Sequence, residues 1–467
     1  MGRLWQAGVV LLIVLGLCYY ILYVSDGQTG DVNSSFMEKL LESEGQEGWA
    51  IFADDCQNVL EGSAARFIGY HPIDENFLLY VATTYGLEGF HEIANTSLVN
   101  SEEWFNYTGK SIHVLWYEYC DLMGLGERYK QRVQVVPVED EEFVIKIAGD
   151  TSFAEKMATT EYMDQQMNGI SDCFSDALLE YMNSASVTIV NNEFAFSNGG
   201  TPLEGKAYTY RANPHRIESY EALGVDLINL ANNHVYDYGE KAFVDTLQTI
   251  TDNGYVYVGA GRNLEEAMQP YYYIYGGRKI AVVTATQIER EEPDIKQHTK
   301  QATVDSPGVM KTSYDGFFLS EIEVAAKNAD VVICIPHWGT EGSMVYGNDQ
   351  YRLARDFAIA GASVIVGGHP HCLQTVEYIG TVPVYYSLGN FYFSYSSNMP
   401  APYDTAIAEI RIGQDKHIET RFVPCLFSDG NICLASEKDE QERVITSISK
   451  LSKSANIDPK TGEISLK

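Results

Sequence analysis

Five short segments of this 467-residue chain carry residues that could bind metal ions. They read Gly149-Asp150, Asn191-Asn192-Glu193, Asn232-Asn233-His234, Pro336-His337 and Gly368-His369-Pro370-His371. Carboxylate, amide and imidazole groups without a thiolate suit Mn²⁺, Zn²⁺ or Fe better than soft metals or a bare Mg²⁺ site. We therefore predict a site for one or two divalent metal ions.

A carboxylate between two such ions, about 3.5–4 Å apart, makes a hydrolytic centre that activates water and clamps an attacked phosphoryl or carbonyl group. Glu193 is our candidate for that bridge. Each segment alone has an ordinary explanation, because Asp often caps a helix and Asn often occupies a turn. The prediction depends on all five segments occurring in order, each after a strand.

The elements that position these segments alternate along the chain. Strands are expected at 143–148, 187–190, 225–230, 279–285, 330–335, 363–366 and 382–386, with helices at 171–183, 239–253, 319–328 and 349–360. This alternation predicts an α/β sheet with crossover connections, and strands at 405–412 and 418–423 predict an antiparallel finish. Ligands bind outside the carboxyl ends of the strands in such sheets, which is where the five segments lie.

Residues 1–25 are predicted to be a transmembrane anchor. The segment 4–24 is uncharged and has about the 20 apolar residues that a bilayer-spanning helix needs. A cleaved signal peptide is the alternative, but its apolar region is usually shorter and ends in small residues. A lipoprotein site at Cys18 would need a small residue where Leu17 stands. Because Arg3 is the only basic residue nearby, we expect the N-terminus in the cytoplasm and the rest of the chain outside the cell membrane.

Four further parts are expected after the anchor. They are a polar tether at 26–48, a helical accessory region at 49–137, the α/β domain at 143–435 and a polar C-terminal tail at 436–467, expected to end in a helix and a loose segment. Cysteine spacing shows no C-x-x-C motif, which argues against a zinc ribbon. Cys425 and Cys433 could form one disulfide.

Acidic residues outnumber basic ones, with 64 Asp+Glu against 32 Lys+Arg and a net charge of -32. Nucleic-acid phosphates are held by Lys/Arg clusters, and the sequence has none, so we exclude a nucleic-acid partner. The same charge disfavours attraction of any polyanionic substrate. Such a substrate would need a local cation, which a metal ion would supply.

These segments resemble the CapA family of capsule or poly-γ-glutamate biosynthesis proteins, within the calcineurin-like metallophosphatase superfamily. The similar stretch, from Val144 to Phe393, includes IAGDTSF at 147–153, VNNEF at 190–194, YRANP at 210–214, LANNHVYDYG at 230–239, VGAGRN at 258–263, PHWGTE at 336–341, GGHPHCLQ at 367–374 and YSLGNFYFS at 386–394. The resemblance implies a metallophosphatase-like α/β sandwich, in which helices cover two central sheets.

The resemblance also implies roles for individual residues. The positions that match metal ligands are Asp150, Asn233, His337, His369 and His371, with Glu193 at the bridging carboxylate and His234 at a histidine that contacts substrate or acts as the general acid. The D-x-H motif of the superfamily lacks its histidine here, because Thr151 and Ser152 follow the aspartate. Arg211 is a candidate contact for an anionic substrate, since a guanidinium fork suits phosphate and carboxylate; a surface ion pair is the alternative.

Two functions are compatible with this pattern. The first is a membrane-anchored, extracytoplasmic hydrolase of phosphoester or amide bonds that acts in synthesis or export of an anionic polymer, with His234 protonating the leaving group. The second is a non-catalytic subunit that binds the polymer and holds other capsule-synthesis membrane proteins together. The missing D-x-H histidine and the helical accessory region favour the second. A general phosphodiesterase matches the motifs less well.

Overall fold

The computed structural model describes two unequal parts of the chain. The described residues are 75–94, 132–138, 142–288, 300–303, 305–312, 316–395 and 401–467, with Leu40, Phe52, 67–68, 71–72, 107–110, Leu115, 118–119 and Leu122. The predicted anchor at 1–25 lies outside them, as does the tether at 26–48 apart from Leu40. Among the helices described, none is both long enough and apolar enough to cross a bilayer. The chain divides into two compact units, Met1–Lys130 and Gln131–Lys467.

Two helices account for most of what is described in the first unit. Its elements are β1 (Phe67–Ile68), β2 (His71–Pro72), α3 (Glu75–Tyr85) and α4 (Leu87–Ala94). In α3 the six successive residues from Phe77 to Ala82 are all buried. The Lys110 ammonium donates to Glu118 at 2.7 Å. Of the predicted helical accessory region at 49–137, the stretches 75–85 and 87–94 are helical, and most of the remaining residues lie outside the described ones.

The second unit is built on two mixed β-sheets, of seven and eight strands. The seven-stranded sheet contains, in spatial order, β16 (Val376–Ile379), β17 (Val382–Tyr385), β15 (Val364–Val366), β14 (Val331–His337), β12 (Arg278–Thr286), β11 (Tyr271–Tyr275) and β3 (Arg132–Val135). The eight-stranded sheet contains β21 (Asn431–Leu434), β20 (Ile418–Ser428), β19 (Asp404–Ile412), β4 (Phe143–Thr151), β5 (Val187–Asn192), β8 (Leu227–Asn229) and β9 (Val256–Val258), with β18 (Asn390–Tyr392) beside β4.

Each sheet contains a set of four neighbouring parallel strands. In one sheet β12, β14, β15 and β17 run parallel, and in the other β4, β5, β8 and β9 do so. The carboxyl ends of each set therefore lie at a common edge. All seven strands predicted before residue 400 are present, and β19 and β20 form the predicted antiparallel finish. The prediction omitted β11, the tyrosine-rich hairpin partner of β12.

Alternating side chains place an apolar layer on both faces of each sheet. In β4, Ile145 and Ile147 contribute to a core that also contains Ile280 and Ile333 of the other sheet, so this core lies between the sheets. Ala148 belongs instead to the core on the outer face. Helices cover the two outer faces, and the predicted α/β sandwich of two sheets covered by helices is confirmed.

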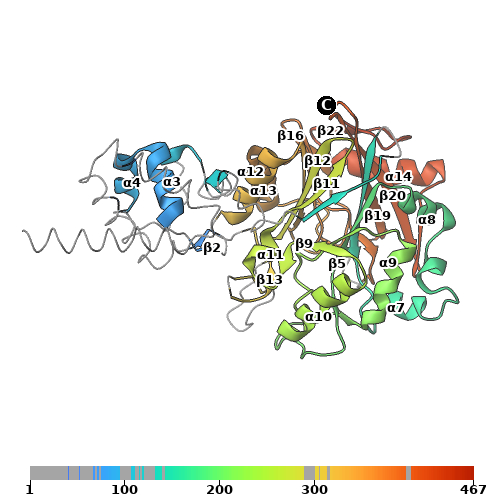
Figure 1. Ribbon diagram of the computed structural model, residues 1–467. Helices are drawn as coiled ribbons and strands as arrows, with labels where there is room; N and C mark the ends of the chain where they lie inside the picture. The colour runs from blue at the N-terminus through green and yellow to red at the C-terminus, as the bar shows by residue number, and fades with distance from the viewer. Residues whose placement is uncertain are drawn as a thin grey trace, which may run out of the picture. The chain divides into compact units, whose positions relative to one another are not determined.

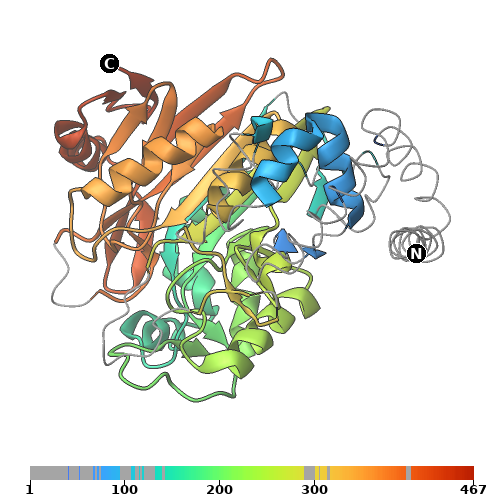
Figure 2. The same cartoon turned by 90° about the vertical axis from the view of Figure 1, so that its left-hand side faces the viewer.

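The covering helices differ between the two outer faces. They are α8 (Asp176–Asn183) and α10 (Gly239–Asp252) on the eight-stranded sheet, and α12 (Phe317–Asn328) and α13 (Asn348–Ala360) on the seven-stranded sheet. In Figure 1, α12 and α13 lie on one side of the strands and α8 on the other. The same layers can be followed from a second direction in Figure 2.

Both ends of this unit differ from the expected boundaries. Within the predicted accessory region at 49–137, β3 pairs in parallel with β11 and so belongs to the second unit. The stretch 436–467 is folded to its end, as α14 (Lys438–Leu451), β22 (Ala455–Ile457) and β23 (Ile464–Leu466). Its few apolar residues are spaced to bury one face, and Val444, Ile445 and Ile448 join the core between the sheets.

The cysteine pairing considered from the sequence is wrong. In the β20–β21 ladder Cys425 is paired with Leu434 and Leu426 with Cys433. The two cysteines are therefore one residue out of register and point to opposite faces of the sheet. Both thiols are free.

Candidate metal centre

The five predicted segments meet where strand ends from both sheets converge. Asp150 lies near the end of β4, and Glu193 directly follows β5. His337 is the last residue of β14 in the other sheet, and its Nδ1 lies 4.0 Å from an Asp150 carboxylate oxygen. The turns after β8 and β15 carry the remaining predicted residues: Asn233, His234, His369 and His371. All are buried.

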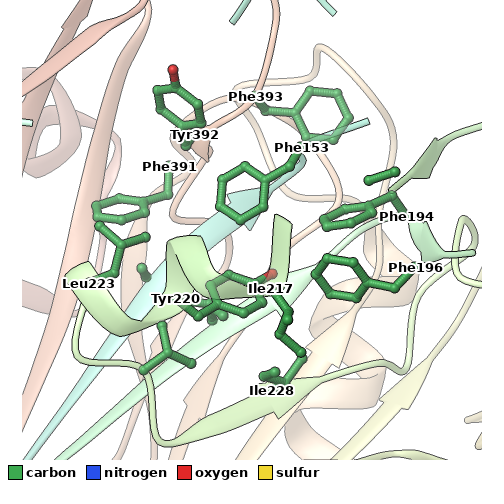
Figure 3. Close-up of a cluster of buried hydrophobic side chains, with 14 of the residues drawn as sticks. Phe153, Phe194, Phe196, Ile217, Tyr220, Leu223, Ile228, Phe391, Tyr392 and Phe393 are labelled. Atoms are coloured by element: carbon green, nitrogen blue, oxygen red, sulfur yellow. The ribbon is translucent and has the colours of Figure 1, made fainter. Parts of the chain in front are cut away.

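Aromatic residues that follow the acidic residues anchor these loops. Phe153 follows the Asp150 segment and Phe194 follows Glu193; their ring centroids lie 5.8 Å apart. Phe194 in turn packs edge-on against Phe196 at 4.6 Å. Figure 3 shows these rings gathered with Tyr220 in the outer core of the eight-stranded sheet. The residues that directly follow the two carboxylates are therefore fixed in a buried apolar core.

Asp150 is hydrogen-bonded from several sides. Asn191 Nδ2 donates to Oδ1 at 2.7 Å, and the His369 backbone N–H donates to Oδ2 at 3.0 Å. His371 Nδ1 lies 3.3 Å from Oδ2. Burial by itself would raise the pKa of Asp150, but the bond and charge of His371, with a contribution from His337, outweigh it and lower that pKa. Asp150 is therefore an ionised carboxylate.

Glu193 is buried and has no hydrogen-bond partner on either carboxylate oxygen. Imidazole nitrogens surround its Oε1: His337 Nε2 at 3.3 Å, His371 Nε2 at 3.9 Å and His234 Nε2 at 4.0 Å. A buried polar group left without partners costs about 1–3 kcal/mol, and more when it is charged. A divalent cation between this carboxylate and the imidazoles would satisfy both oxygens, so the residues present fit a metal ion.

Three groups of side chains among the described residues bring their ligand atoms within 4.8 Å of one another. They are Glu193, His337 and His369; Asp150, Glu193 and His371; and Glu341, His369 and His371. The first two groups share Glu193, the residue expected to bridge two ions. Asn233 Oδ1 lies 2.8 Å from His337 Nε2, which adds an oxygen ligand beside the first group. The six predicted metal ligands thus form one cluster; that they bind metal stays a prediction.

His371 is held in its protonated form by the two carboxylates. Burial would lower its pKa, but Glu193 and Asp150 outweigh burial and raise that pKa to about 10. Its Nδ1 also lies 2.7 Å from Asn390 Oδ1. A protonated imidazole cannot coordinate, so a metal ion entering the site must displace this proton.

The H-x-H loop has an unusual backbone. His369 has φ 96° and His371 has φ 56°, in the left-handed region that residues other than glycine rarely adopt. Such strain persists where the surroundings impose it, and it concentrates at functional sites. The preceding Gly368 leaves room for the aspartate, because a Cβ there would lie 2.7 Å from Asp150 Oδ1. The loop is therefore shaped to bring both imidazoles beside Asp150.

His234 lies at the edge of the cluster in a polar network of its own. Its Nδ1 lies 2.7 Å from Asp237 Oδ2, which also accepts a bond from the Tyr210 backbone N–H. The Lys206 ammonium pairs with the other Asp237 oxygen. Burial and then the Lys206 charge lower the pKa of His234 well below its ordinary value. A neutral imidazole with Nδ1–H bound to Asp237 leaves Nε2 on the Glu193 side able to exchange a proton.

The structure does not bring Arg211 into the cluster. Its guanidinium donates to the Gly199 carbonyl at 2.7 Å and lies over the Tyr238 ring at 4.3 Å. The neighbouring Tyr210 packs its ring 4.4 Å from that of His234 instead. Successive residues of an extended chain point to opposite sides, so only one of the two can face the site.

Sequence reasoning missed three residues around the cluster. Asn191 and Asn390 bind Asp150 and His371, and Glu341 joins the outer ligand group. The two asparagines lie within motifs already noted, but asparagine is common in turns and gave no separate signal. Glu341 stands four residues beyond His337 in PHWGTE, where only the loop conformation places it near other ligands.

A profile described as "Bacterial capsule synthesis protein PGA_cap" matches residues 144–395, more than half of the chain. This chain belongs to the PGA_cap family. The match spans the convergence site from Asp150 to His371.

Curated relatives carry names that agree with the PGA_cap family. The "PGA biosynthesis protein CapA" of Bacillus subtilis (strain 168) is 36% identical over 189 residues, which cover 39% of this chain and 46% of that protein. The "Capsule biosynthesis protein CapA" of Bacillus anthracis is 29% identical over 242 residues, covering 50% and 56%. The chain thus spans about half the length of these relatives. A crystal structure of 5'-nucleotidase from Candida albicans SC5314 aligns with a TM-score of 0.32 and 10% identity, covering 63% of this chain and 52% of that one.

Proposed function

We propose that this PGA_cap-family chain is a membrane-anchored, extracytoplasmic, metal-dependent hydrolase of phosphoester or amide bonds. It would act in synthesis or export of an anionic cell-surface polymer such as poly-γ-glutamate, the role that the names of its relatives suggest. The apolar segment at 4–24 supports the anchor. The observation that carries the hydrolase is Glu193, a buried carboxylate without a hydrogen bond, surrounded by imidazoles.

The residues that would hold the ions are the two groups sharing Glu193, with Asn233 beside the first. When bound, Mn²⁺, Zn²⁺ or Fe ions activate water and polarise the attacked bond. The chain's own part is to position and move a proton. Asp237 fixes the His234 ring through Nδ1, so Nε2 is the atom that accepts a proton and returns it to the leaving group.

A non-catalytic binding or assembly subunit is the second candidate. The ligand group of Asp150, Glu193 and His371 contains only three residues, and the first two residues after Asp150 supply no imidazole. A site that is one ligand short can hold an ion weakly or serve only to bind polymer carboxylates. The two candidates differ in turnover, since both keep the fold and at least one ion.

The test uses the full-length chain in detergent, with metal content per mole measured by mass spectrometry. We expect bound divalent metal in the wild type and its loss in the His369→Ala/His371→Ala variant. With a phosphoester and a γ-glutamyl amide as substrates, His234→Ala should reduce hydrolysis by about 10²- to 10⁴-fold, the range typical for a proton-transfer group. His215→Ala, whose side chain is 90% exposed, is the matched control.

Three results would decide between the candidates. If the wild-type protein contained no divalent metal, both the hydrolase and a metal-binding assembly subunit would be contradicted. Metal-loaded protein that turns over neither substrate, yet binds polymer, favours the assembly subunit. Full hydrolysis in His234→Ala removes the proposed role of that histidine.

A further inference from the structure

Glu341 lies on the solvent side of the histidine pair. One of its carboxylate oxygens lies within 4.8 Å of ligand nitrogens of His369 and His371. The same two histidines also belong to the groups that contain Glu193, which is buried. Each imidazole therefore has a buried carboxylate and an exposed one among its neighbours. No hydrogen bond occupies the Glu341 carboxylate among the contacts of the described residues.

The loop that carries Glu341 is fastened to the histidine loop. The Gly342 backbone N–H donates to the carbonyl of Pro370, between the two histidines, at 2.9 Å, and the Trp338 N–H donates to Gly368 at 3.1 Å. Further along, Gln374 Nε2 donates to the Ser343 carbonyl at 2.7 Å. These bonds bracket Glu341 on both sides, so its carboxylate is held near the histidines although its side chain is exposed.

The two buried groups differ in the number of side chains that could coordinate a metal ion. The group of Glu193, His337 and His369 has Asn233 beside it, which makes four ligands. The group of Asp150, Glu193 and His371 has three. Catalytic Zn²⁺ sites commonly combine three protein ligands with one open position, so an ion held by the second group would have room for one more donor.

We propose that Glu341 is an exchangeable ligand of the second ion, closing the site from solvent and yielding its position to the substrate. This inference rests on the metal centre proposed above. The fastened loop fixes where the carboxylate sits, and its exposure allows it to move aside by side-chain rotation. A role as metal ligand also gives a reason for an exposed acidic residue beside a site that we propose acts on an anionic polymer.

The experiment compares Glu341→Gln with the wild type by isothermal titration of metal-free, full-length protein with MnCl₂. We expect two binding steps in the wild type. The variant should keep the tighter step and weaken the other by about tenfold or more, a loss that removal of even a supporting group produces at metal sites. Glu437→Gln, an exposed glutamate at the start of α14 without a side-chain cap bond, is the matched control and should behave as the wild type.

A second measurement separates ligand loss from misfolding. Because the Glu341 side chain is exposed, its substitution should leave the melting temperature in EDTA unchanged and lower only the stabilisation that MnCl₂ adds. Identical titrations of Glu341→Gln and wild type overturn the role of Glu341 while the metal centre stands. A single step in the wild type also overturns it, and a wild type that binds no Mn²⁺ overturns the proposed metal centre itself.

Discussion

Replacing Glu193 by glutamine should change stability in opposite directions with and without metal. At an effective dielectric constant of 20, the His371 charge 3.9 Å from Glu193 contributes roughly 4 kcal/mol of attraction. The Asp150 carboxylate, whose ligand atom is within 4.8 Å, contributes at least roughly 3.5 kcal/mol of repulsion on the same scale. The two terms nearly cancel. What remains is the cost of a buried carboxylate without hydrogen bonds, about 1–3 kcal/mol.

Glutamine keeps the shape and removes the charge, so the metal-free variant should be more stable than the wild type. For a unit of this size, 1 kcal/mol corresponds to about 2 °C in melting temperature, which gives a rise of roughly 2–6 °C in EDTA. With Mn²⁺ the order should reverse. An ion at about 1,000 times its dissociation constant stabilises the wild type by about 4.1 kcal/mol, which exceeds the advantage of the metal-free variant, and the variant loses most of this stabilisation.

Scanning calorimetry in EDTA and in MnCl₂ measures both effects. The matched control is Glu321→Gln, a second buried glutamate in α12 with an unpartnered carboxylate oxygen, which belongs to no ligand group. Its change in melting temperature should be the same with and without metal. If Glu193→Gln lowered the melting temperature equally in both buffers, Glu193 would be an ordinary structural residue and the bridging role would be refuted.

Three further predictions address the surroundings of the site. Asp237→Asn should reduce hydrolysis by about 10²-fold or more with unchanged metal content, because the variant no longer fixes the His234 ring. A loss of bound metal that matches the loss of hydrolysis would contradict this prediction. Arg211→Ala should leave the Michaelis constant within about twofold, because its guanidinium binds Gly199 rather than the site, and a large rise would restore it as a substrate contact. Burial raises the pKa of Glu321 from 4.5 to about 8, so its contribution to stability is fully present below pH 4.5 and is lost as pH rises toward 8. Glu321→Gln should flatten that pH dependence in denaturant titrations, and parallel pH profiles would show that another group causes it.

Much of the fold could be predicted because its signals are local. Apolar β-branched runs such as 187–190 are short and lie between helical patterns, and these two periods identify strands and helices. The prediction of a loose tail at 436–467 was wrong because the stretch is polar on average. Its helix nevertheless buries one face through Val444, Ile445 and Ile448. The predicted disulfide between the two cysteines was also wrong. The direction of a side chain depends on the register of its strand, and the spacing of residues in the sequence does not determine that register.

For the site, the sequence determined which residues stand at the strand ends, because parallel strands bring their carboxyl ends to one edge and the ligands come directly after those ends. Only the tertiary structure decided how they meet. Packing of the two sheets brings Asp150 and His337 to 4.0 Å. It also leaves the Glu193 carboxylate buried without hydrogen bonds and directs the Arg211 side chain away from His234. It also places Glu341 near His369, which lies 28 residues further along the sequence. Chain order decides which residue succeeds each strand, whereas distances between separate strands depend on packing that no single segment encodes.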